Sequence, residues 1–567
     1  MRIRSSVLSF AICLTAWAQP YQVKVENNVP ATMRDGVVLM ADVYRPMADG
    51  KFPVLLQRTP YNRTGGSGAH VDVASHGYVV IVQDTRGRYQ SQGTFYPFRY
   101  ESQDGYDTVE WAAALPYSNG QVGMFGGSYV GATQMLASIA RPPHLVSIFP
   151  YVTASEYYEG WTYQGGALMQ WFTSSWATGL AVDTVTRQVA ETGDAKSWVT
   201  QLPVDAYRLI ALPGAGVAPY FRDWVAHERD DDYWRPWKIS DHYGEMTVKA
   251  LHSGGWYDLF LKGTIQNFIG MRRTSPSSAG QRLLLGPWGH TNTSPEGKIG
   301  DWVFGKQAVL DFNQILLNWA DYSLKGVQNE YATGAPVRIF VMGENVWRDE
   351  QEFPLARTQY TNYYLHHGAL STASPAAEET PEAYEYDPAN AVPTIGGRLC
   401  CGNNQLPPGP ADQRPNEGRP DVVVFSTPPL EKDIEVTGFI HAKIYAESSA
   451  VDTDFTAMLT DVEPSGYSRL LTDGIVRARY RNSTAKAEPI EPGKIYEYDI
   501  DLWATSNVFK AGHRIRLAIS SSNFPRFDRN LNTGEPALGA TRMVKAQQKL
   551  YHDTAHPSAL VLPVIPR

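Results

Sequence analysis

The stretch from Val122 to Ala140, VGMFGGSYVGATQMLASIA, constrains this chain more than any other. In it a short apolar run meets a glycine-flanked serine, Ser128, and then the pattern of a helix built from small residues. The missing side chains of Gly126, Gly127 and Gly131 suit a tight strand-to-helix turn that pushes a nucleophile outward. The spacing G-x-S-x-x-G predicts such a nucleophile elbow. A glycine-rich turn whose serine only caps the helix is the alternative.

Short apolar runs around this elbow predict a parallel sheet that helices cover on both faces. Two of them, Val248 to His252 and Leu283 to Leu285, run into the glycine-containing loops GGWYD and GPWGH. These loops carry Asp258 and His290, which with Ser128 follow the chain order Ser, Asp, His of α/β-hydrolases. Because the carboxyl ends of parallel strands meet at one edge of a sheet, we predict that the three residues form a catalytic triad.

Changes in sequence character along the chain predict its domains. After residue 150, strand-and-loop alternation gives way to helix-like stretches rich in Trp and Ala, which we interpret as a helical cap. After about Phe353, apolar and alternating runs of strand length predict a β-sandwich. The predicted fold class is α/β, an α/β-hydrolase domain with a helical cap insertion and a C-terminal β-sandwich. The expected boundaries are 19–150 and 246–352 for the hydrolase domain, 151–245 for the cap and 353–567 for the β-sandwich.

The charge balance excludes one class of partner. With 58 Asp and Glu against 50 Lys and Arg, the formal net charge is −8, which leaves no basic face for nucleic acid. The charged run from His227 to Asp232 predicts a solvated acidic surface. The sequence does not determine the oligomeric state, and a homodimer stays open.

The first 18 residues have the pattern of a signal peptide. Arg2 and Arg4 precede the apolar run from Val7 to Ala18, and Ala16 and Ala18 offer small side chains at a cleavage site. The apolar run is shorter than the roughly 20 residues of a membrane helix, and no later run is long enough. We therefore predict an exported protein without a membrane span, either secreted or periplasmic.

Cysteines and metal-ligand patterns are sparse in this chain. Cys13 lies in the predicted signal peptide, which leaves Cys400 and Cys401 side by side in the mature protein. Adjacent cysteines can bond only through a strained small ring, so a vicinal disulfide and two packed thiols both remain open. The sequence has neither a C-x-x-C pair nor H-E-x-x-H, and it predicts no metal ion and no organic cofactor.

Stretches spread from about residue 29 to the C-terminus carry a family resemblance, among them QDTRG, VGMFGGSYVGATQ, GGWYD, GPWGH and SSSNFPRFDRNLNTG. In these stretches the chain resembles the cocaine esterase and X-Pro dipeptidyl-peptidase family of serine hydrolases. The resemblance implies that Ser128 is the nucleophile, His290 the general base and Asp258 its orienting acid. It also implies an oxyanion hole made by the Tyr61 hydroxyl and the backbone N–H of Tyr129, and a jelly-roll topology for the C-terminal domain.

The resemblance also implies an apolar acyl pocket between the three domains. Trp176 in the cap and Phe260 after the triad aspartate match aromatic residues of the pocket in the family's esterases. Cys400 and Cys401 stand where those esterases have a leucine and a phenylalanine. An ester of an uncharged aromatic or aliphatic acyl group is the expected small-molecule substrate, cleaved through an acyl-enzyme without a cofactor.

Other activities remain open at this point. The family's α-amino acid ester hydrolases bind a substrate ammonium with carboxylates, two of which correspond to Phe260 and Leu261 here. X-Pro dipeptidyl-peptidases recognise an N-terminal amine. A glutaryl-type acylase shares the same intermediate, because amides and esters are cleaved alike. An inactive binding protein on the same scaffold is the remaining alternative.

Overall fold

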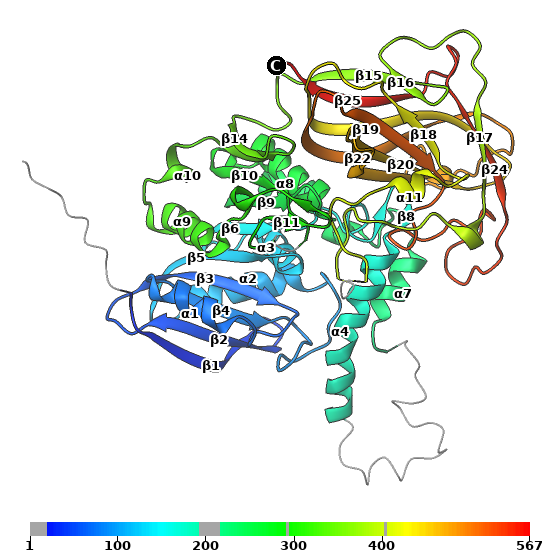
Figure 1. Cartoon of the computed structure of the whole chain (residues 1–567). Helices are drawn as coiled ribbons and strands as arrows, with labels where there is room; N and C mark the ends of the chain where they lie inside the picture. The colour runs from blue at the N-terminus through cyan, green and yellow to red at the C-terminus, as the bar shows by residue number, and fades with distance from the viewer. Residues whose placement is uncertain (1–19, 192–215, 291–293, 402–404) are drawn as a thin grey trace, which may run out of the picture.

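The computed structural model describes residues 20–191, 216–290, 294–401 and 405–567 (Figure 1). Two large sheets dominate it, one formed by strands up to Glu350 and the other by strands from Gln359 onward. The predicted α/β fold with a second, β-rich domain is confirmed. The predicted signal peptide, 1–18, lies outside the described residues. Among the residues that are described, none of the helices combines the length and the apolar character needed to cross a bilayer.

The first sheet has the strand order β1-β2-β4-β3-β5-β6-β9-β10-β13-β14. The strands from β4 to β13 run parallel, and antiparallel strands extend both edges. Every residue of β4 and of β10 is buried, because helices cover both faces, and this explains the apolar sequences. The strands are β1 (Val23–Thr32), β2 (Val38–Pro46), β3 (Phe52–Thr59), β4 (Val79–Asp84), β5 (Ser118–Gly127), β6 (Leu145–Tyr151), β9 (Lys249–Gly255), β10 (Gln281–Gly286), β13 (Val337–Val341) and β14 (Val346–Glu350).

Helices pack on the two faces of this sheet according to the alternation of strand side chains. Val54 and Leu56 of β3 pack with α2 and α3, whereas Leu55 packs with α1 and α9 on the other face. α3 follows β5 at the predicted elbow, and α8 follows β9. The helices are α1 (Ser67–Ser75), α2 (Glu101–Ala113), α3 (Tyr129–Ala140), α8 (Leu261–Thr274), α9 (Phe312–Lys325) and α10 (Glu330–Thr333).

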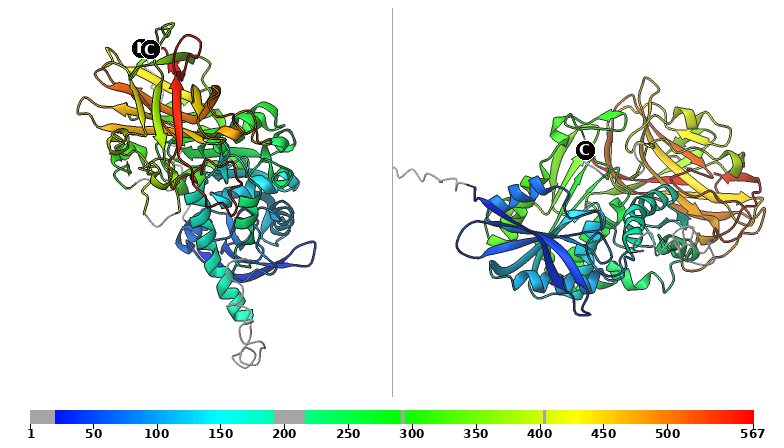
Figure 2. Two further views of the ribbon diagram at one scale, coloured as in Figure 1. Left: turned by 90° about the vertical axis from the view of Figure 1, so that its right-hand side faces the viewer. Right: turned by 90° about the horizontal axis from the view of Figure 1, so that it is seen from below.

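Between β6 and β9 the chain leaves the sheet and forms the cap. Two short strands, β7 (Tyr163–Gln164) and β8 (Ala167–Leu168), lead into α4 (Gln170–Glu191), which packs on α7 (Pro219–Ala226). Figure 2 shows the far end of α4 projecting away from the body of the protein, and Val182 is 68% exposed. The buried part of α4 is its first half, which packs in the same apolar cluster as α2, α3 and the first sheet.

The second sheet connects eleven strands around one apolar core. Leu459 of β20 and Leu550 of β24 belong to the same buried cluster although their strands lie near opposite ends of the sheet, so the sheet folds over on itself. The jelly-roll topology and the exact domain boundaries stay predictions. The strands are β15 (Gln359–His366), β16 (Ala369–Ser371), β17 (Glu382–Tyr386), β18 (Val423–Ser426), β19 (Ile434–Ser448), β20 (Asp454–Val462), β21 (Ser468–Arg477), β22 (Tyr496–Phe509), β23 (Arg514–Ser520), β24 (Ala546–Tyr551) and β25 (Ala559–Ile565).

The acidic run after α7 is not simply a solvated surface, and the sequence prediction is wrong for Glu228. The Glu228 side chain is 17% exposed and accepts a hydrogen bond of 3.0 Å from Arg479 of the second domain. It also accepts from the backbone N–H of Ala537. Asp232, by contrast, is 85% exposed. Glu228 therefore fastens the cap to the β-rich domain through a mostly buried ion pair, in which the loss of either partner would leave a buried charge unpaired.

A buried pair of polar side chains joins β9 to β10. His252 is 1% exposed, and its Nε2 lies 3.1 Å from Gln281 Oε1. The Gln281 amide nitrogen donates to Val248 O and Ser277 O, so its oxygen faces the ring and Nε2 is assigned the proton. Burial lowers the pKa of His252 to about 4, and the ring is neutral in the folded protein.

We expect acid to destabilise the fold through His252. The unfolded chain binds this proton near pH 6.5 and the folded chain only near pH 4, so the free energy of unfolding falls over that interval by up to about 3 kcal/mol. In urea titrations, H252L should therefore lose less stability than the wild type between pH 6.5 and pH 4. The matched variant H76L should keep the wild-type slope, because His76 is exposed and has no carboxylate partner among the described residues. Equal slopes for all three proteins would contradict this role.

Candidate active site

Ser128 forms the turn between β5 and α3. Its φ of 60° lies in the left-handed region, which costs energy for a residue with a side chain and marks a strained strand-to-helix turn. Ser128 N–H donates to Tyr151 O on β6, and Ser128 O accepts from Thr153 Oγ1. The Ser128 side chain makes no capping hydrogen bond to α3, which argues against the capping alternative.

The two positions before Ser128 require glycine, because neighbouring atoms lie too close to leave room for a side chain. A Cβ on Gly127 would lie 2.2 Å from the Tyr151 ring. A Cβ on Gly126, where φ is 129°, would lie 2.3 Å from Val130. Side chains at these two positions would force β5 and its neighbours apart. The turn thus has the geometry that the sequence predicts for a nucleophile elbow.

His290 and Asp258 meet across the loops that follow β10 and β9. His290 Nδ1 lies 2.7 Å from Asp258 Oδ1. The Asp258 side chain is fully buried and that of His290 is 9% exposed. A buried carboxylate that accepts from Nδ1 fixes the orientation and the tautomer of the ring, and it leaves Nε2 to face a reacting group.

Backbone hydrogen bonds hold these two loops together. Trp256 N–H donates to Gly286 O and Tyr257 N–H donates to Trp288 O, both at 2.9 Å. The Trp288 indole N–H donates in turn to Ala308 O at 2.6 Å. The loops GGWYD and GPWGH are therefore one rigid unit, which sets the carboxylate beside the imidazole.

Tyr61 lies in the loop after β3, and its hydroxyl reaches the elbow. It accepts a hydrogen bond of 2.9 Å from Trp176 Nε1 of α4. It also interacts with the Ser128 side chain and the Tyr129 backbone N–H. Tyr61 as a whole is 41% exposed, yet burial of its hydroxyl raises its pKa. The phenol is therefore protonated at neutral pH and can donate to an oxygen atom close to Ser128.

The backbone N–H of Tyr129 lies beside the Tyr61 hydroxyl, whereas the Tyr129 side chain makes buried contacts with Glu101 and Phe98. Its hydroxyl donates to Glu101 Oε1 at 2.9 Å and accepts from Phe98 N–H at 3.0 Å. Glu101 also accepts from Arg58 at 2.7 Å. These buried contacts hold the first turn of α3, and with it the Tyr129 N–H, near the Tyr61 hydroxyl.

A row of aromatic side chains links Tyr61 to His290. Trp176, which is 4% exposed, meets Trp161 edge to face with ring centres 5.9 Å apart. Trp161 stacks on the fully buried Phe260 at 4.4 Å, and Phe260 meets the His290 ring edge to face at 5.2 Å. The structure thus brings Trp176 and Phe260, which the family resemblance assigns to the acyl pocket, into one apolar wall beside the imidazole.

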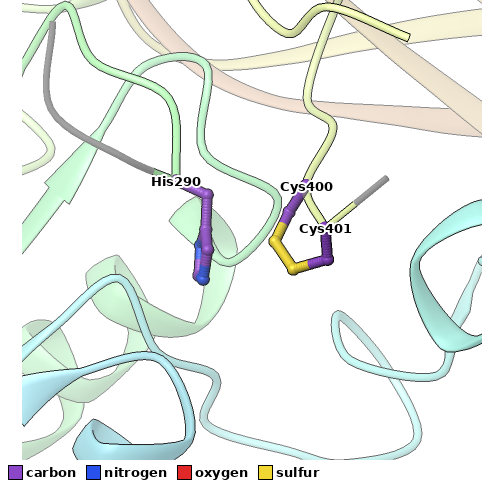
Figure 3. Close-up of side chains that lie close together, drawn as sticks. All are labelled: His290, Cys400 and Cys401. Atoms are coloured by element: carbon purple, nitrogen blue, oxygen red, sulfur yellow. A yellow bond between two sulfur atoms is a disulfide. The ribbon is translucent and has the colours of Figure 1, made fainter. Parts of the chain in front are cut away.

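Cys400 and Cys401 are joined in a disulfide and lie beside His290 (Figure 3). A sulfur of each and a ring nitrogen of His290 lie within 4.8 Å of one another. Cys400 packs against the apolar cluster that contains Trp176 and Phe260, whereas Cys401 is exposed. The structure has the disulfide, one of the two states that the sequence left open.

Arg88 is a positioning residue that sequence reasoning missed. It is 1% exposed and donates to Pro60 O at 2.9 Å and to Leu180 O at 3.0 Å. These bonds tie the Tyr61 loop to α4. The signal that could have found Arg88 is the second arginine of QDTRGRY, directly after a buried strand.

A pocket beside His290 was also missed. It has a volume of about 260 Å³, and Val152 and Ser253 line it together with His290. Val152 has φ of 45°, a strained conformation for a β-branched residue, and Ser253 Oγ has no hydrogen-bond partner among the described residues. The apolar run 145–151, which forms β6 and ends at this pocket, is the signal that could have found it.

Comparison with known proteins identifies the family. Residues 35–292 match the X-Pro dipeptidyl-peptidase (S15 family), and residues 329–561 match the X-Pro dipeptidyl-peptidase C-terminal non-catalytic domain. The chain is 38% identical to cocaine esterase of Rhodococcus sp. (strain MB1 Bresler), over 96% of this chain and 99% of that protein. The chain belongs to the X-Pro dipeptidyl-peptidase (S15) family. The resemblance stated from the sequence is confirmed, and the protein is a serine hydrolase.

Two solved structures share the fold over nearly the whole chain. An aminopeptidase from a marine sediment Thaumarchaeota archaeon has a TM-score of 0.82 at 25% identity and covers 99% of both chains. An α-amino acid ester hydrolase has a TM-score of 0.81 at 24% identity and covers 98% of this chain and 100% of its own. The predicted fold class, an α/β-hydrolase domain with a cap and a C-terminal β domain, is confirmed.

Removing the indole N–H that holds Tyr61 should slow the enzyme. We expect W176F to lower kcat for p-nitrophenyl butyrate about fivefold, because one neutral hydrogen bond that orients the phenol is lost while an aromatic ring remains. The control is W319F at a tryptophan 2% exposed, whose indole N–H has no partner among the described residues. W319F should keep the wild-type kcat. An unchanged kcat in W176F would mean that the Trp176 contact does not orient Tyr61.

Proposed function

We propose that the protein hydrolyses carboxylic esters of apolar acyl groups through an acyl-enzyme on Ser128, with His290 as general base and Asp258 as its orienting acid. The observation that carries the proposal is the buried hydrogen bond of 2.7 Å between His290 Nδ1 and Asp258 Oδ1. It lies at the edge of the sheet where β5 ends in the strained turn of Ser128. Identity of 38% to cocaine esterase supports the ester as the substrate class.

In the proposed first half-reaction, His290 Nε2 takes the Ser128 proton while the serine oxygen attacks the ester carbonyl. Asp258 stabilises the imidazolium that forms, because a buried carboxylate interacts strongly with a neighbouring charge. The carbonyl oxygen becomes an oxyanion, for which we propose the Tyr61 hydroxyl and the Tyr129 N–H as donors. The contact between these two groups beside Ser128 supports that assignment.

The first half-reaction ends when the protonated His290 gives its proton to the leaving alcohol, the C–O bond breaks and the acyl group remains on Ser128. The second half-reaction is the hydrolysis of this acyl-enzyme. The same imidazole then activates a water molecule, which hydrolyses the acyl-enzyme and restores the serine. All proton transfers in this cycle use groups of the chain and water, so no cofactor enters it.

The apolar acyl group is proposed from its surroundings. Phe260 and Leu261 stand where related α-amino acid ester hydrolases have ammonium-binding carboxylates, and both side chains are fully buried. The carboxylates nearby are already paired, since Lys262 Nζ lies 2.9 Å from both Glu159 and Asp501. Within the part of this wall that the structure describes, a substrate ammonium would therefore find these carboxylates already neutralised.

Hydrolysis of substrates with a free α-amino group is the second candidate. The fold shared with an aminopeptidase at 25% identity and a TM-score of 0.82 favours it. The paired state of Glu159 and Asp501 weighs against it.

The pattern of residues 1–18 supports a further proposal, export to the periplasm or the medium. A homodimer stays a prediction.

Variants of Ser128 and Tyr61 test the mechanism. S128A should abolish both hydrolysis of p-nitrophenyl butyrate and labelling by a fluorophosphonate. Y61F should lower kcat about 10²–10³-fold with little change in KM, because its donor acts on charge that develops only in the transition state. Y220F is the control, at a buried tyrosine whose ring lies 6.1 Å from that of Trp176, and it should keep the wild-type kcat. Near wild-type hydrolysis by S128A would refute the triad.

A series of aryl esters tests the acyl group. We expect kcat/KM for benzoyl, phenylacetyl and butyryl esters to exceed that for glycyl and glutaryl esters by about tenfold or more, because an unpaired charge in an apolar site is costly. The rates of all esters are measured on one preparation, and the concentration of its active sites is determined by fluorophosphonate titration of a separate aliquot. A preference for the glycyl ester would favour the second candidate, and a preference for the glutaryl ester would indicate an acylase.

A further inference from the structure

We propose that Cys400 and Cys401, once reduced, form with His290 a binding site for a soft divalent metal ion such as Zn²⁺, and that the bound ion switches the hydrolase off. The three donors come from two domains and lie side by side in Figure 3. Binding of the ion does not depend on the proposed function. Only the accompanying loss of activity rests on it.

The distances from His290 to the two sulfur atoms are close to those between the ligands of a zinc site. Zn²⁺ binds cysteine sulfur at about 2.3 Å and histidine nitrogen at about 2.0–2.1 Å in tetrahedral geometry. Its ligands therefore lie roughly 3.5–3.8 Å apart. A nitrogen of His290 already lies within 4.8 Å of both sulfur atoms, while the two sulfur atoms, bonded to each other in the structure, must move apart after reduction. Cys401 is exposed, which gives the ion access and leaves the fourth position to water.

The bond between His290 and Asp258 prepares the imidazole as a ligand. Metal-bound histidines commonly donate their other ring N–H to a carboxylate, which fixes the tautomer and makes the ligating nitrogen more basic. Asp258 accepts from His290 Nδ1 at 2.7 Å, so Nε2 is the nitrogen left for the metal. In the proposed reaction the same Nε2 accepts the Ser128 proton. Metal binding and catalysis therefore exclude each other.

The site forms only after the disulfide is reduced, because the two sulfur atoms are bonded to each other in the structure. A dithiol reductant supplies two electrons and two protons to the S–S bond, which opens to two thiols while the reductant closes to its own cyclic disulfide. Zn²⁺ then displaces the two thiol protons, and the thiolates bind without further electron transfer. Under oxidising conditions the imidazole stays free.

The test compares one chain in two redox states. In C13S, Cys400 and Cys401 are the only cysteines. The protein is reduced with dithiothreitol, freed of it under nitrogen and titrated with buffered free Zn²⁺, in parallel with the oxidised protein. We expect the reduced form to lose hydrolysis of p-nitrophenyl butyrate about tenfold or more at micromolar free Zn²⁺, with one ion bound per chain, and to recover with a chelator. The oxidised form should keep its activity.

A second measurement follows the metal rather than the activity. Cd²⁺ bound to the reduced chain should show the ultraviolet charge-transfer band of cadmium thiolates, and H290A should bind Cd²⁺ about tenfold or more weaker with that band retained, because one of three ligands is lost. C401S should lose most of the band. For C401S, the hydrolysis rate in the presence of Zn²⁺ is divided by the rate in its absence, and this ratio should be close to one.

Three results would overturn the proposal: equal inhibition of oxidised and reduced protein, full activity of the reduced protein in Zn²⁺, or unchanged Cd²⁺ affinity in H290A. A failure of the proposed function is seen separately. If the oxidised protein is not labelled on Ser128 by a fluorophosphonate, the esterase proposal fails, while Cd²⁺ binding still decides whether the metal site exists.

Discussion

The hydrogen bond from His290 to the buried carboxylate of Asp258 is the interaction on which the rest of the site depends. It exists because β9 and β10 lie next to each other in a parallel sheet, so that their following loops leave the same edge. The backbone bonds between these loops keep the two side chains 2.7 Å apart. The bond orients the ring for proton transfer, and by the same physics it orients the ring as a metal ligand.

The β-rich domain takes part in this site rather than only flanking it. Arg398, just before the two cysteines, is 1% exposed and donates to Thr472 Oγ1 at 2.7 Å and to Leu502 O at 3.2 Å. Burial lowers its pKa to about 10, while the field of Asp473 acts in the opposite direction. This anchored arginine fixes the segment that brings Cys400 and Cys401 to His290. Glu228 and Arg479 make a second connection, between the cap and the same domain.

Much of the site could be predicted because each residue of the predicted triad lies in a short segment with its own recognisable sequence pattern. β5, β9 and β10 each come from a short apolar run that leads into a glycine-containing turn or loop. These are local signals, and each turn or loop carries one residue of the predicted triad. Arg88 and Glu228 were missed or misread for the opposite reason. A charged side chain in a loop looks the same in sequence whether it faces water or a partner that lies far away along the chain. Their partners, Leu180 O and Arg479, belong to other domains.

The sequence by itself determined which short apolar runs form the strands beside the site, the elbow at Ser128 and the residue types that follow each strand. It could do so because hydrophobic periodicity and glycine requirements act within a few residues. Only the tertiary structure decided that the adjacent cysteines are bonded and lie beside His290. That contact joins residues more than a hundred positions apart, and it depends on how the β-rich domain docks on the sheet, which no local pattern encodes.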